Sequence, residues 1–486
     1  MKFYTLHCCL IIFFMSILQP CFSQVPDSWD KIKFPPLDWK VPQGDKYKTT
    51  LDNKLIAYIA VDSVLPYFAI QGYIGYGTIN DPPNKEGISS LLVKLLRSGG
   101  TKVYLSDSLD HLIDLYALNF SFSVSKTEIS FSCSGLSDFL DTALFMLSQM
   151  LFYPSFEDKK FKKEVSNFLD IISHRFDNPS PILQAVYEKT MYKNGENSRL
   201  PTEKSVKNIS KKDIIELHKD IFKTQNIILS IAGNFSKEKV VNKLITLFPS
   251  SSDTVSRYKY PSINISPLSK MVIINKKLTQ CYVRMGFPLF KRPNDDYYPV
   301  QILNVILGGD GFNSRLNTKI RSDEGLAYVV YSNAESNYFY PATLFIEFHT
   351  KNETASKVIY LALKEIEKIQ ASGINDTELT HAKKVLIDGF PSMFRTKEDI
   401  VDNYAYNEFL KRPMDHFINY PNKINAIKKE EVDSVAKKYL NISSICYTIV
   451  GDTSIIFKND TVSGFSLKNL KPFIVFNQPD SVLQLK

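Results

Sequence analysis

The strongest constraint on the fold is a pattern that occurs twice in the chain. Each copy has two lysines, an acidic start, an amphipathic helix ending in Phe or Tyr, a short polar turn, an apolar strand, and a Gly followed by Asn or Asp. The copies read KKDIIELHKDIFKTQNIILSIAGNF (211–235) and KKEEVDSVAKKYLNISSICYTIVGDT (428–453), and their strands end at Gly233 and Gly451. The repetition indicates an internal duplication, although helix-turn-strand units are also common in unrelated α+β proteins.

The length of the chain and a polar segment near its middle indicate two comparable halves. At about 100–200 residues per domain, 486 residues allow two to four domains. The segment 249–268 is rich in Ser and Pro, as expected of an interdomain linker. We therefore predict a signal peptide (1–23), an N-terminal domain (24–250), a linker (251–268), a C-terminal domain (269–470) and a tail (471–486).

Expected strands occur in adjacent pairs in both halves, which favours antiparallel sheets over a doubly wound parallel sheet. The predicted fold class is α+β, with two homologous domains, each a mainly antiparallel sheet with helices packed on it. The pattern predicts strands at 55–62, 67–76, 119–125, 128–134, 270–276, 280–287, 327–334 and 341–350. It predicts helices at 86–98, 105–116, 136–152, 157–176, 211–222, 294–307, 313–323, 354–372, 375–391 and 398–412.

The N-terminus is typical of an export signal. One charge, Lys2, precedes an apolar stretch at 10–18, and the small residues Cys21 and Ser23 stand at positions -3 and -1 of a cleavage point before Gln24. The other interpretation is an N-terminal membrane anchor. We favour export with cleavage, which predicts a periplasmic or secreted protein.

Charge and hydropathy argue against two classes of partner. The net charge is +8, or +7 once Lys2 is removed with the signal, and the Lys and Arg residues are scattered along the chain. Scattered charge gives little support to nucleic-acid binding. Mean hydropathy is -0.14 and the only long apolar run is N-terminal, so we expect no membrane association beyond the signal peptide.

Residues able to bind a transition metal are few and widely spaced. After removal of the signal, three cysteines remain in apolar stretches, an odd number that predicts buried free thiols. No two of the remaining histidines lie within one or two helical turns of each other, so each is more easily explained as a packed or surface side chain. These residues are Cys133, Cys281 and Cys446, and His111, His174, His218, His349, His381 and His416.

A frame in the first half has a familiar arrangement. Residues 72–101 read GYIGYGTINDPPNKEGISSLLVKLLRSGGT: a strand, a Pro-rich loop, a helix opened by Glu86-Gly87, and a close on Gly-Gly-Thr. This resembles the insulinase/pitrilysin family of zinc peptidases, including the mitochondrial processing peptidase branch. The resemblance implies a clam-shell of two domains. In that family the helix carries H-x-x-E-H: the two His bind zinc, and the Glu activates the metal-bound water.

The chemistry of that motif is missing here. Alignment on the frame places Ser90 and Lys94 at the two zinc-ligand positions and Val93 at the position of the general base, while the further acidic ligand falls on Asp170 of a later helix. We therefore expect no metal, no cofactor and no catalytic residue in this chain. Lys94 either forms an ion pair with Asp170, because a buried unpaired Lys is costly, or extends to solvent in an open cleft.

A second block, in the second half, keeps its motif. Residues 307–331 read LGGDGFNSRLNTKIRSDEGLAYVVY, which resembles the C-terminal domain of the same family. Arg321 and Tyr328 match its paired Arg and Tyr, which in the peptidases reach the substrate beside the scissile bond. A guanidinium and a phenol both donate well to a peptide carbonyl. The structural alternative is that Arg321 pairs with Asp323 or Glu324 while Tyr328 is half-buried. We expect Gly308 and Gly309 in this block to serve backbone geometry and not contact.

Family members also bind peptide as an added strand at a sheet edge beside the zinc helix. The segment 119–134 (NFSFSVSKTEISFSCS) alternates apolar and polar residues and is a candidate for that edge. An ordinary hairpin explains the pattern equally well.

The leading functional hypothesis follows from what is kept and what is lost. In one branch of the family, two-domain chains work in pairs, with zinc in one partner and the Arg/Tyr pair in the other. We therefore predict a non-catalytic subunit of an exported heterodimeric zinc peptidase, whose zinc-bearing relative holds the metal and which supplies Arg321 and Tyr328 to peptide substrates. The alternative is a stand-alone pseudopeptidase that binds peptides without cleaving them. A self-sufficient hydrolase has no support, because the sequence has no Gly-x-Ser-x-Gly elbow.

Overall fold

The computed structural model describes residues 39–484 apart from 193–194, 251–258, 266 and 268–269, together with residues 28 and 32. The predicted signal peptide and much of the predicted linker lie outside the described residues. The chain divides into two units, Met1–Lys40 and Val41–Lys486, and every element named below belongs to the second. Among the helices of the described residues, none combines the length and the apolar character needed to span a membrane.

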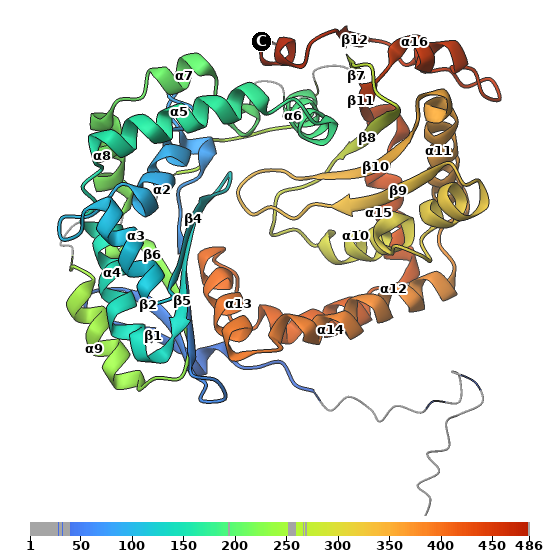
Figure 1. Cartoon of the computed structure of the whole chain (residues 1–486). Coiled ribbons are helices and arrows are strands. Elements are labelled where there is room, and N and C mark those ends of the chain that lie inside the picture. The colour runs from blue at the N-terminus through green and yellow to red at the C-terminus, as the bar shows by residue number, and fades with distance from the viewer. Residues whose placement is uncertain are drawn as a thin grey trace, which may run out of the picture. The chain divides into compact units, whose positions relative to one another are not determined.

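The second unit contains two sheets of six strands each (Figure 1). The first has the order β1-β2-β6-β3-β5-β4, and only the β2–β6 pair is parallel. Its strands are β1 (Lys48–Thr50), β2 (Ile56–Val61), β3 (Tyr67–Ile74), β4 (Asn119–Val124), β5 (Ile129–Leu136) and β6 (Ile227–Gly233).

The second sheet repeats the first from the second position onward. Its order is β12-β7-β11-β8-β10-β9, and the pairs β7–β11 and β12–β7 are parallel while the others are antiparallel. Only the first strand differs in direction, because β1 is antiparallel to its neighbour and β12 is parallel. The strands are β7 (Met271–Asn275), β8 (Gln280–Pro288), β9 (Ala327–Ala334), β10 (Thr343–Lys351), β11 (Cys446–Gly451) and β12 (Phe473–Phe476). The segment predicted as a tail thus contributes a strand.

The helices repeat with the same spacing as the sequence pattern. Helix α8 (Lys211–Ile221) precedes β6, and helix α15 (Lys429–Tyr439) precedes the matching strand β11. The first and last residues of α15 follow those of α8 by the same number of residues that separates Gly451 from Gly233. The first residues of helices α6 (Pro179–Tyr192) and α13 (Lys397–Phe409) have the same offset. The predicted internal duplication and the α+β fold class are therefore confirmed by the topology.

Each sheet carries a hydrophobic core on one face. The core of the first sheet is built with α2 (Ile88–Ser98), α3 (Ser106–Leu115), α4 (Leu140–Phe152), α5 (Asp158–His174), α8 and α9 (Lys237–Leu247). The core of the second sheet is built with α10 (Tyr297–Asn304), α11 (Ala355–Ser372), α12 (Asp376–Gly389), α14 (His416–Ala426) and α15. Short helices α7 (Glu203–Lys207) and α16 (Thr453–Ile456) complete the set of α-helices described.

The other face of each sheet is covered by a helix from the opposite half. Helix α13, from the second half, packs on β6, β2 and β3 of the first sheet, and helix α6, from the first half, packs on β11 and β8 of the second. Figure 1 shows α13 beside the first sheet and α6 beside the second. We call this arrangement the helix exchange.

Polar contacts fix the register of both exchanged helices. In the first interface, Asp402 of α13 accepts hydrogen bonds from Tyr73 Oη (2.9 Å) and Ser230 Oγ (3.1 Å). Burial raises the pKa of Asp402 despite these two donors. The carboxylate therefore positions α13 through specific partners while costing some stability at neutral pH.

The second interface is built around a buried ion pair. Arg284 of β8 donates to Glu347 of β10, with Nε 2.8 Å from Oε2, and Arg284 also donates to Gln184 of α6. Both charged side chains are 8% exposed. The Arg284 guanidinium lies 4.9 Å from the ring of Tyr187 on α6, so α6 is held by one cation through both a hydrogen bond and an aromatic contact.

Candidate functional site

The site begins where helix α2 starts, at the position of the zinc helix in the family that the sequence resembles. Gly87 precedes the helix with a φ of +99° in the left-handed region, and a Cβ there would lie 2.7 Å from the ring of Phe168. Asp81 Oδ2 accepts a hydrogen bond from Gly87 N at 2.9 Å. Only glycine suits this backbone and this close contact, which explains why the Glu86-Gly87 frame survives although the metal ligands do not.

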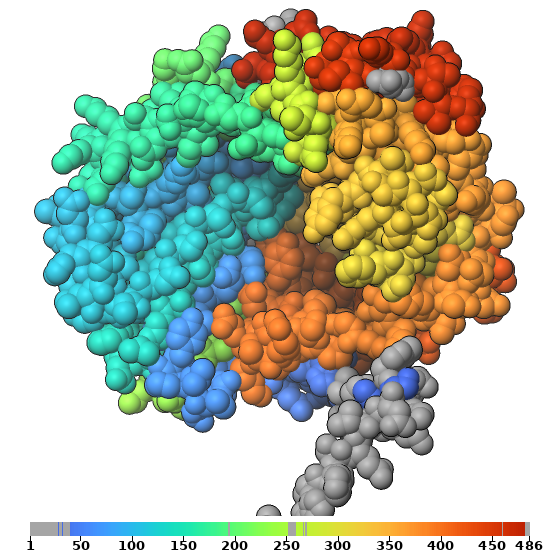
Figure 2. Space-filling view, turned by 45° about the vertical axis from the view of Figure 1, so that its right-hand side comes forward, coloured from blue at the N-terminus to red at the C-terminus, as the bar shows by residue number. Residues whose placement is uncertain are grey.

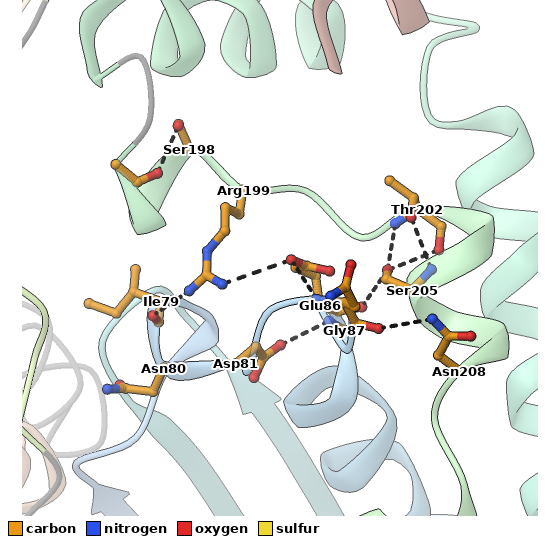
Figure 3. Close-up of polar contacts among 12 residues, drawn as sticks. Ile79, Asn80, Asp81, Glu86, Gly87, Ser198, Arg199, Thr202, Ser205 and Asn208 are labelled. Carbon is orange, nitrogen blue, oxygen red and sulfur yellow. Dashed lines mark hydrogen bonds and ion pairs between the residues drawn. The ribbon is translucent and has the colours of Figure 1, made fainter. Parts of the chain in front are cut away.

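A network of polar contacts holds the start of α2 in place (Figure 3). Arg199 donates to Ile79 O at 3.2 Å and lies 3.8 Å from the Glu86 carboxylate, while Ser205 Oγ donates to Glu86 O at 3.0 Å. Asp81 is 1% exposed, and burial raises its pKa to about 6 despite the hydrogen bond from the backbone of Gly87. The loop and the helix start are therefore rigidly connected to the segment 196–208.

The three residues that the alignment places at the zinc-motif positions all lie on α2, but their side chains are not those of a zinc site. Ser90 and Lys94, one helical turn apart, are half-buried, and Val93 is 4% exposed within the first core. The Lys94 ammonium lies 5.3 Å from the ring centroid of Phe168, a cation–π contact. A hydroxyl, an isopropyl group and an ammonium replace two imidazoles and a carboxylate, and an ammonium repels a metal cation.

The proposed ion pair between Lys94 and Asp170 does not form. The Asp170 side chain is 75% exposed and its carboxylate lies 3.7 Å from His174 Nε2 on its own helix. Helix α5 turns Phe168 toward α2, and two residues further along a helix the side chain points about 200° away. The spacing along the chain predicted Asp170, but the face of α5 that packs on α2 carries Phe168 instead. Lys94 forms no ion pair with any of the described residues.

The remaining candidate ligands do not gather elsewhere in the part of the chain that the structure describes. No group of three or more His, Cys, Asp or Glu side chains is arranged there to hold a metal ion. Cys133, Cys281 and Cys446 are free and buried, as their apolar surroundings predict. His218 is packed in the interior: its Nε2 lies 2.9 Å from Leu151 O, and burial lowers its pKa.

We expect the purified chain, after dialysis against zinc and then against buffer, to retain less than about 0.1 equivalent of zinc, because the described residues provide no set of nitrogen, sulfur or carboxylate donors around the α2 position. Elemental analysis by mass spectrometry measures the content. Lys94→Ala, which removes the repelling ammonium without adding a ligand, should give the same value. Zinc near one equivalent in the wild-type chain would contradict this account of the site.

The second component of the site lies at the edge strand β9 and the π-helix η8 (Asn317–Asp323). The Arg321 guanidinium lies 4.9 Å from the Tyr328 ring and 5.7 Å from the Phe312 ring. Both rings are open to solvent, with Tyr328 81% and Phe312 78% exposed. A half-buried cation beside two exposed rings forms a patch, here called the Arg321 patch, that can meet a peptide through hydrogen bonds and through aromatic contact.

The structural alternative for this pair is wrong. The two neighbouring acids bind lysines: Asp323 lies 4.0 Å and Glu324 3.1 Å from Lys319 Nζ, and Glu324 also lies 2.8 Å from Lys357 Nζ. Arg321 forms no ion pair with any residue of the described ranges. Its donors are therefore available to a ligand, which is what the predicted substrate-binding role requires.

The expectation for the paired glycines needs correction. Neither Gly308 nor Gly309 has a positive φ. A Cβ on Gly308 would lie 2.5 Å from Ser332 N of β9, and one on Gly309 would lie 2.6 Å from the Asn304 side chain. Gly308 allows the π-helix η7 (Val305–Gly309) to pack closely on β9, the edge strand that carries Tyr328, while Gly309 lies close to Asn304 at the end of α10. Close packing and not a positive φ therefore explains both glycines.

The segment proposed as a peptide-binding edge does lie at an edge. Strand β4 is the last strand of the first sheet, and it packs beside α2. Along β4, Asn119, Ser121 and Ser123 are exposed. An exposed edge leaves backbone groups free to pair with an extended chain, so the geometry permits strand addition next to the altered metal position.

The sequence interpretation missed a cavity lined by two copies of one tripeptide. Lys-Arg-Pro occurs at 291–293 and again at 411–413, and both copies line the same space of about 1050 Å³. The repetition of a short basic motif was a signal available in the sequence. Figure 2 shows a recess in this unit, where the orange surface of residues near 400 is set back between the teal and yellow surfaces on either side.

Comparison with known proteins agrees with the topology. The family model described as "Insulinase (Peptidase family M16)" matches residues 67–204, and the one described as "Peptidase M16 inactive domain" matches residues 208–386. The non-peptidase homologue YmxG of Helicobacter pylori is 24% identical over 386 residues, covering 78% of this chain and 87% of its own. The uncharacterized zinc protease YmxG of Bacillus subtilis is 24% identical over 377 residues, covering 76% and 90%.

Solved structures share the fold. A peptidase M16 inactive domain from Pseudomonas fluorescens superposes with a TM-score of 0.74 at 19% identity, covering 84% of this chain and 97% of that one. A protease from Helicobacter pylori superposes with a TM-score of 0.74 at 17% identity, covering 85% and 100%. Together with the frame at Glu86-Gly87, the repeated sheet and the matches over both halves, these findings show that the chain belongs to the insulinase (M16) peptidase family, as a member that lacks the zinc motif.

Proposed function

We propose that this protein is the non-catalytic subunit of an exported heterodimeric zinc peptidase, in which a zinc-bearing relative cleaves peptides and this chain supplies Arg321 and Tyr328. The observation that carries the proposal is the contrast between the two halves. The α2 position holds Ser90, Val93 and Lys94, so it cannot activate water, whereas the Arg321 patch is exposed and its guanidinium has no carboxylate partner among the described residues.

The chemistry of the Arg321 patch supports a role in substrate binding. A guanidinium has several N–H donors and a phenol has one, and both suit a peptide carbonyl that gains negative charge during hydrolysis. The name of the Helicobacter pylori relative, a non-peptidase homologue, is consistent with a chain that does not cleave on its own. The N-terminal pattern of residues 1–23 supports export.

The test is reconstitution with a zinc-bearing family member from the same organism. The mature chain alone should cleave no peptide. Mixed with the relative, it should elute as a heterodimer in size-exclusion chromatography with light scattering, and the rate of peptide cleavage should rise above that of the relative alone. The chain isolated from its native host should begin near Gln24. Failure to form a complex with every such relative would overturn the heterodimer.

A second candidate function, a stand-alone pseudopeptidase, is favoured by one observation. The edge strand β4 lies beside α2 within this chain, so strand addition of a peptide needs no partner subunit. If no zinc-bearing relative binds, peptide capture by the isolated chain should still be detectable by fluorescence anisotropy with extended peptides.

A further inference from the structure

The cavity lined by the two Lys-Arg-Pro tripeptides lies apart from both parts of the site described above. Most of its walls come from four stretches that are distant in the sequence: the end of β3, the segment 259–264, the segment 291–298 and the segment 409–423. Neither Lys94 nor Arg321 lines it. Its volume of about 1050 Å³ is at the upper end of small-molecule sites.

The first unusual feature of this cavity is Arg292. Its side chain is 5% exposed, it donates to Ser336 Oγ at 3.3 Å, and its Nε has no hydrogen-bond partner. The guanidinium lies 3.4 Å from the ring centroid of Tyr297. Across the ranges that the structure describes, no carboxylate forms an ion pair with it. A buried cation without a counter-ion is costly to a fold.

The second feature is that another arginine stands close by. Arg412 lies 4.7 Å from the Tyr338 ring, and Arg292 lies 4.8 Å from the same ring. The Nε of Arg412 is also buried without a partner. Burial lowers the pKa of Arg412, and the charge of Arg292 adds to that effect. Both guanidiniums therefore lie beside the Tyr338 ring, and neither forms an ion pair with an acid of the described chain.

The remaining charged groups do not neutralise the two guanidiniums. Four lysines line the cavity against two aspartates, Asp295 and Asp415, whose side chains face solvent. His416 adds no positive charge at neutral pH, because burial and then the charges of Arg412, Arg292 and Lys423 lower its pKa to about 3. The lysines are Lys259, Lys291, Lys411 and Lys423.

We propose that this cavity binds an oxyanion, a carboxylate or a phosphate group, between Arg292 and Arg412. An oxyanion accepts from both guanidiniums and supplies the counter-charge that the described chain itself does not provide. The size of the cavity and its aromatic walls, Tyr298, Phe339 and Phe409, accommodate a ligand with an apolar body attached to the anionic group. This assignment is independent of the proposed heterodimer.

Binding of two probes to the full mature chain tests the assignment. Isothermal titration calorimetry at fixed ionic strength with inorganic phosphate, and separately with an N-acetylated glutamate pentapeptide, should show saturable binding of at least one probe; the corresponding glutamine peptide, amidated at its C-terminus, should not bind. Phosphate binding alone identifies a phosphate source, and peptide binding alone a carboxylate source. Absence of saturable binding by both probes would overturn the proposal.

Substitutions of the two arginines test whether the probe binds in this cavity. Arg412→Gln and Arg292→Gln should each weaken the bound probe at least about tenfold, the loss expected for one charge-assisted contact. Arg395→Gln removes the same charge from an exposed position outside the cavity and should leave affinity unchanged. If Arg292→Gln fails to fold, Arg412→Gln, which is less buried, still decides. Unchanged affinity in Arg412→Gln would show that the two arginines only pack against Tyr338.

Discussion

Replacement of Arg321 by Ala is expected to abolish the gain in peptide cleavage that this chain gives a zinc-bearing partner, while the heterodimer still forms. The side chain lies between two exposed rings and forms no ion pair within the described chain, so its loss removes donors to the substrate without exposing a buried acid. Removal of one donor to a developing oxyanion costs about 100–1000-fold in rate. Steady-state cleavage by the reconstituted pair measures the effect.

Two further variants separate binding chemistry from packing. Tyr328→Phe removes only the hydroxyl and should lower the rate less than Arg321→Ala, because the ring that lies beside the guanidinium remains. Arg395→Ala removes an exposed arginine that directly follows helix η10 (Phe390–Phe394) and should leave the rate unchanged. If Arg321→Ala and Arg395→Ala behave alike, the Arg321 patch does not contact the substrate.

Glu347→Gln is expected to lower the free energy of unfolding by about 3–5 kcal/mol, the cost of leaving one member of a buried ion pair without its partner. Arg284 would keep its charge at 8% exposure, with the neutral amide oxygen of Gln184 still accepting a hydrogen bond from it. Equilibrium unfolding in guanidinium chloride measures the change. The double variant Arg284→Met/Glu347→Leu should recover most of the loss, because two apolar side chains leave no charge unpaired.

The same pair predicts a pH dependence. Burial raises the pKa of Glu347, but the hydrogen bond from His349 and the charge of Arg284 outweigh it and leave the pKa below its ordinary value of 4.5. A lowered carboxyl pKa contributes stability that is present above the ordinary value and is lost as the pH falls through the lowered one. The double variant should therefore lose less stability than the wild type on acidification. Glu203→Gln, which breaks an exposed pair with Lys207 on one helix, serves as the control and should leave the pH dependence nearly unchanged.

Periodicity predicted most of the fold because most elements have one apolar and one polar face. The strand at 327–334 and the helix at 211–221 have the predicted bounds or nearly so. Helix α6 was missed because it is apolar or small around most of its circumference. Most of its side chains are buried, because the helix lies between the two halves. Its sequence therefore lacks the alternation of polar and apolar residues that marks a helix at the surface.

The site was predicted in part, and the failures have a physical reason. The sequence predicts that Ser90, Val93 and Lys94 lie on one helix, and they do lie on α2, because positions within a helix follow a fixed period. The prediction fails for Asp170, because the contact between two helices depends on which face each presents, and a shift of two positions replaces a carboxylate with the ring of Phe168. The cationic cavity was missed because its two tripeptides lie far apart in the sequence and meet only in the folded chain.

The helix exchange has a consequence for the origin of this chain. A single repeat of about half the length would leave one face of its sheet bare, because the helix that covers that face belongs to the other repeat. A single-repeat ancestor would therefore have needed a second copy of itself, each lending a helix to the other across a two-fold axis. In a single chain the two repeats are no longer required to be identical. The cavity of Arg292 and Arg412 does not follow this two-fold relation, because its two tripeptides do not share the spacing of the repeat.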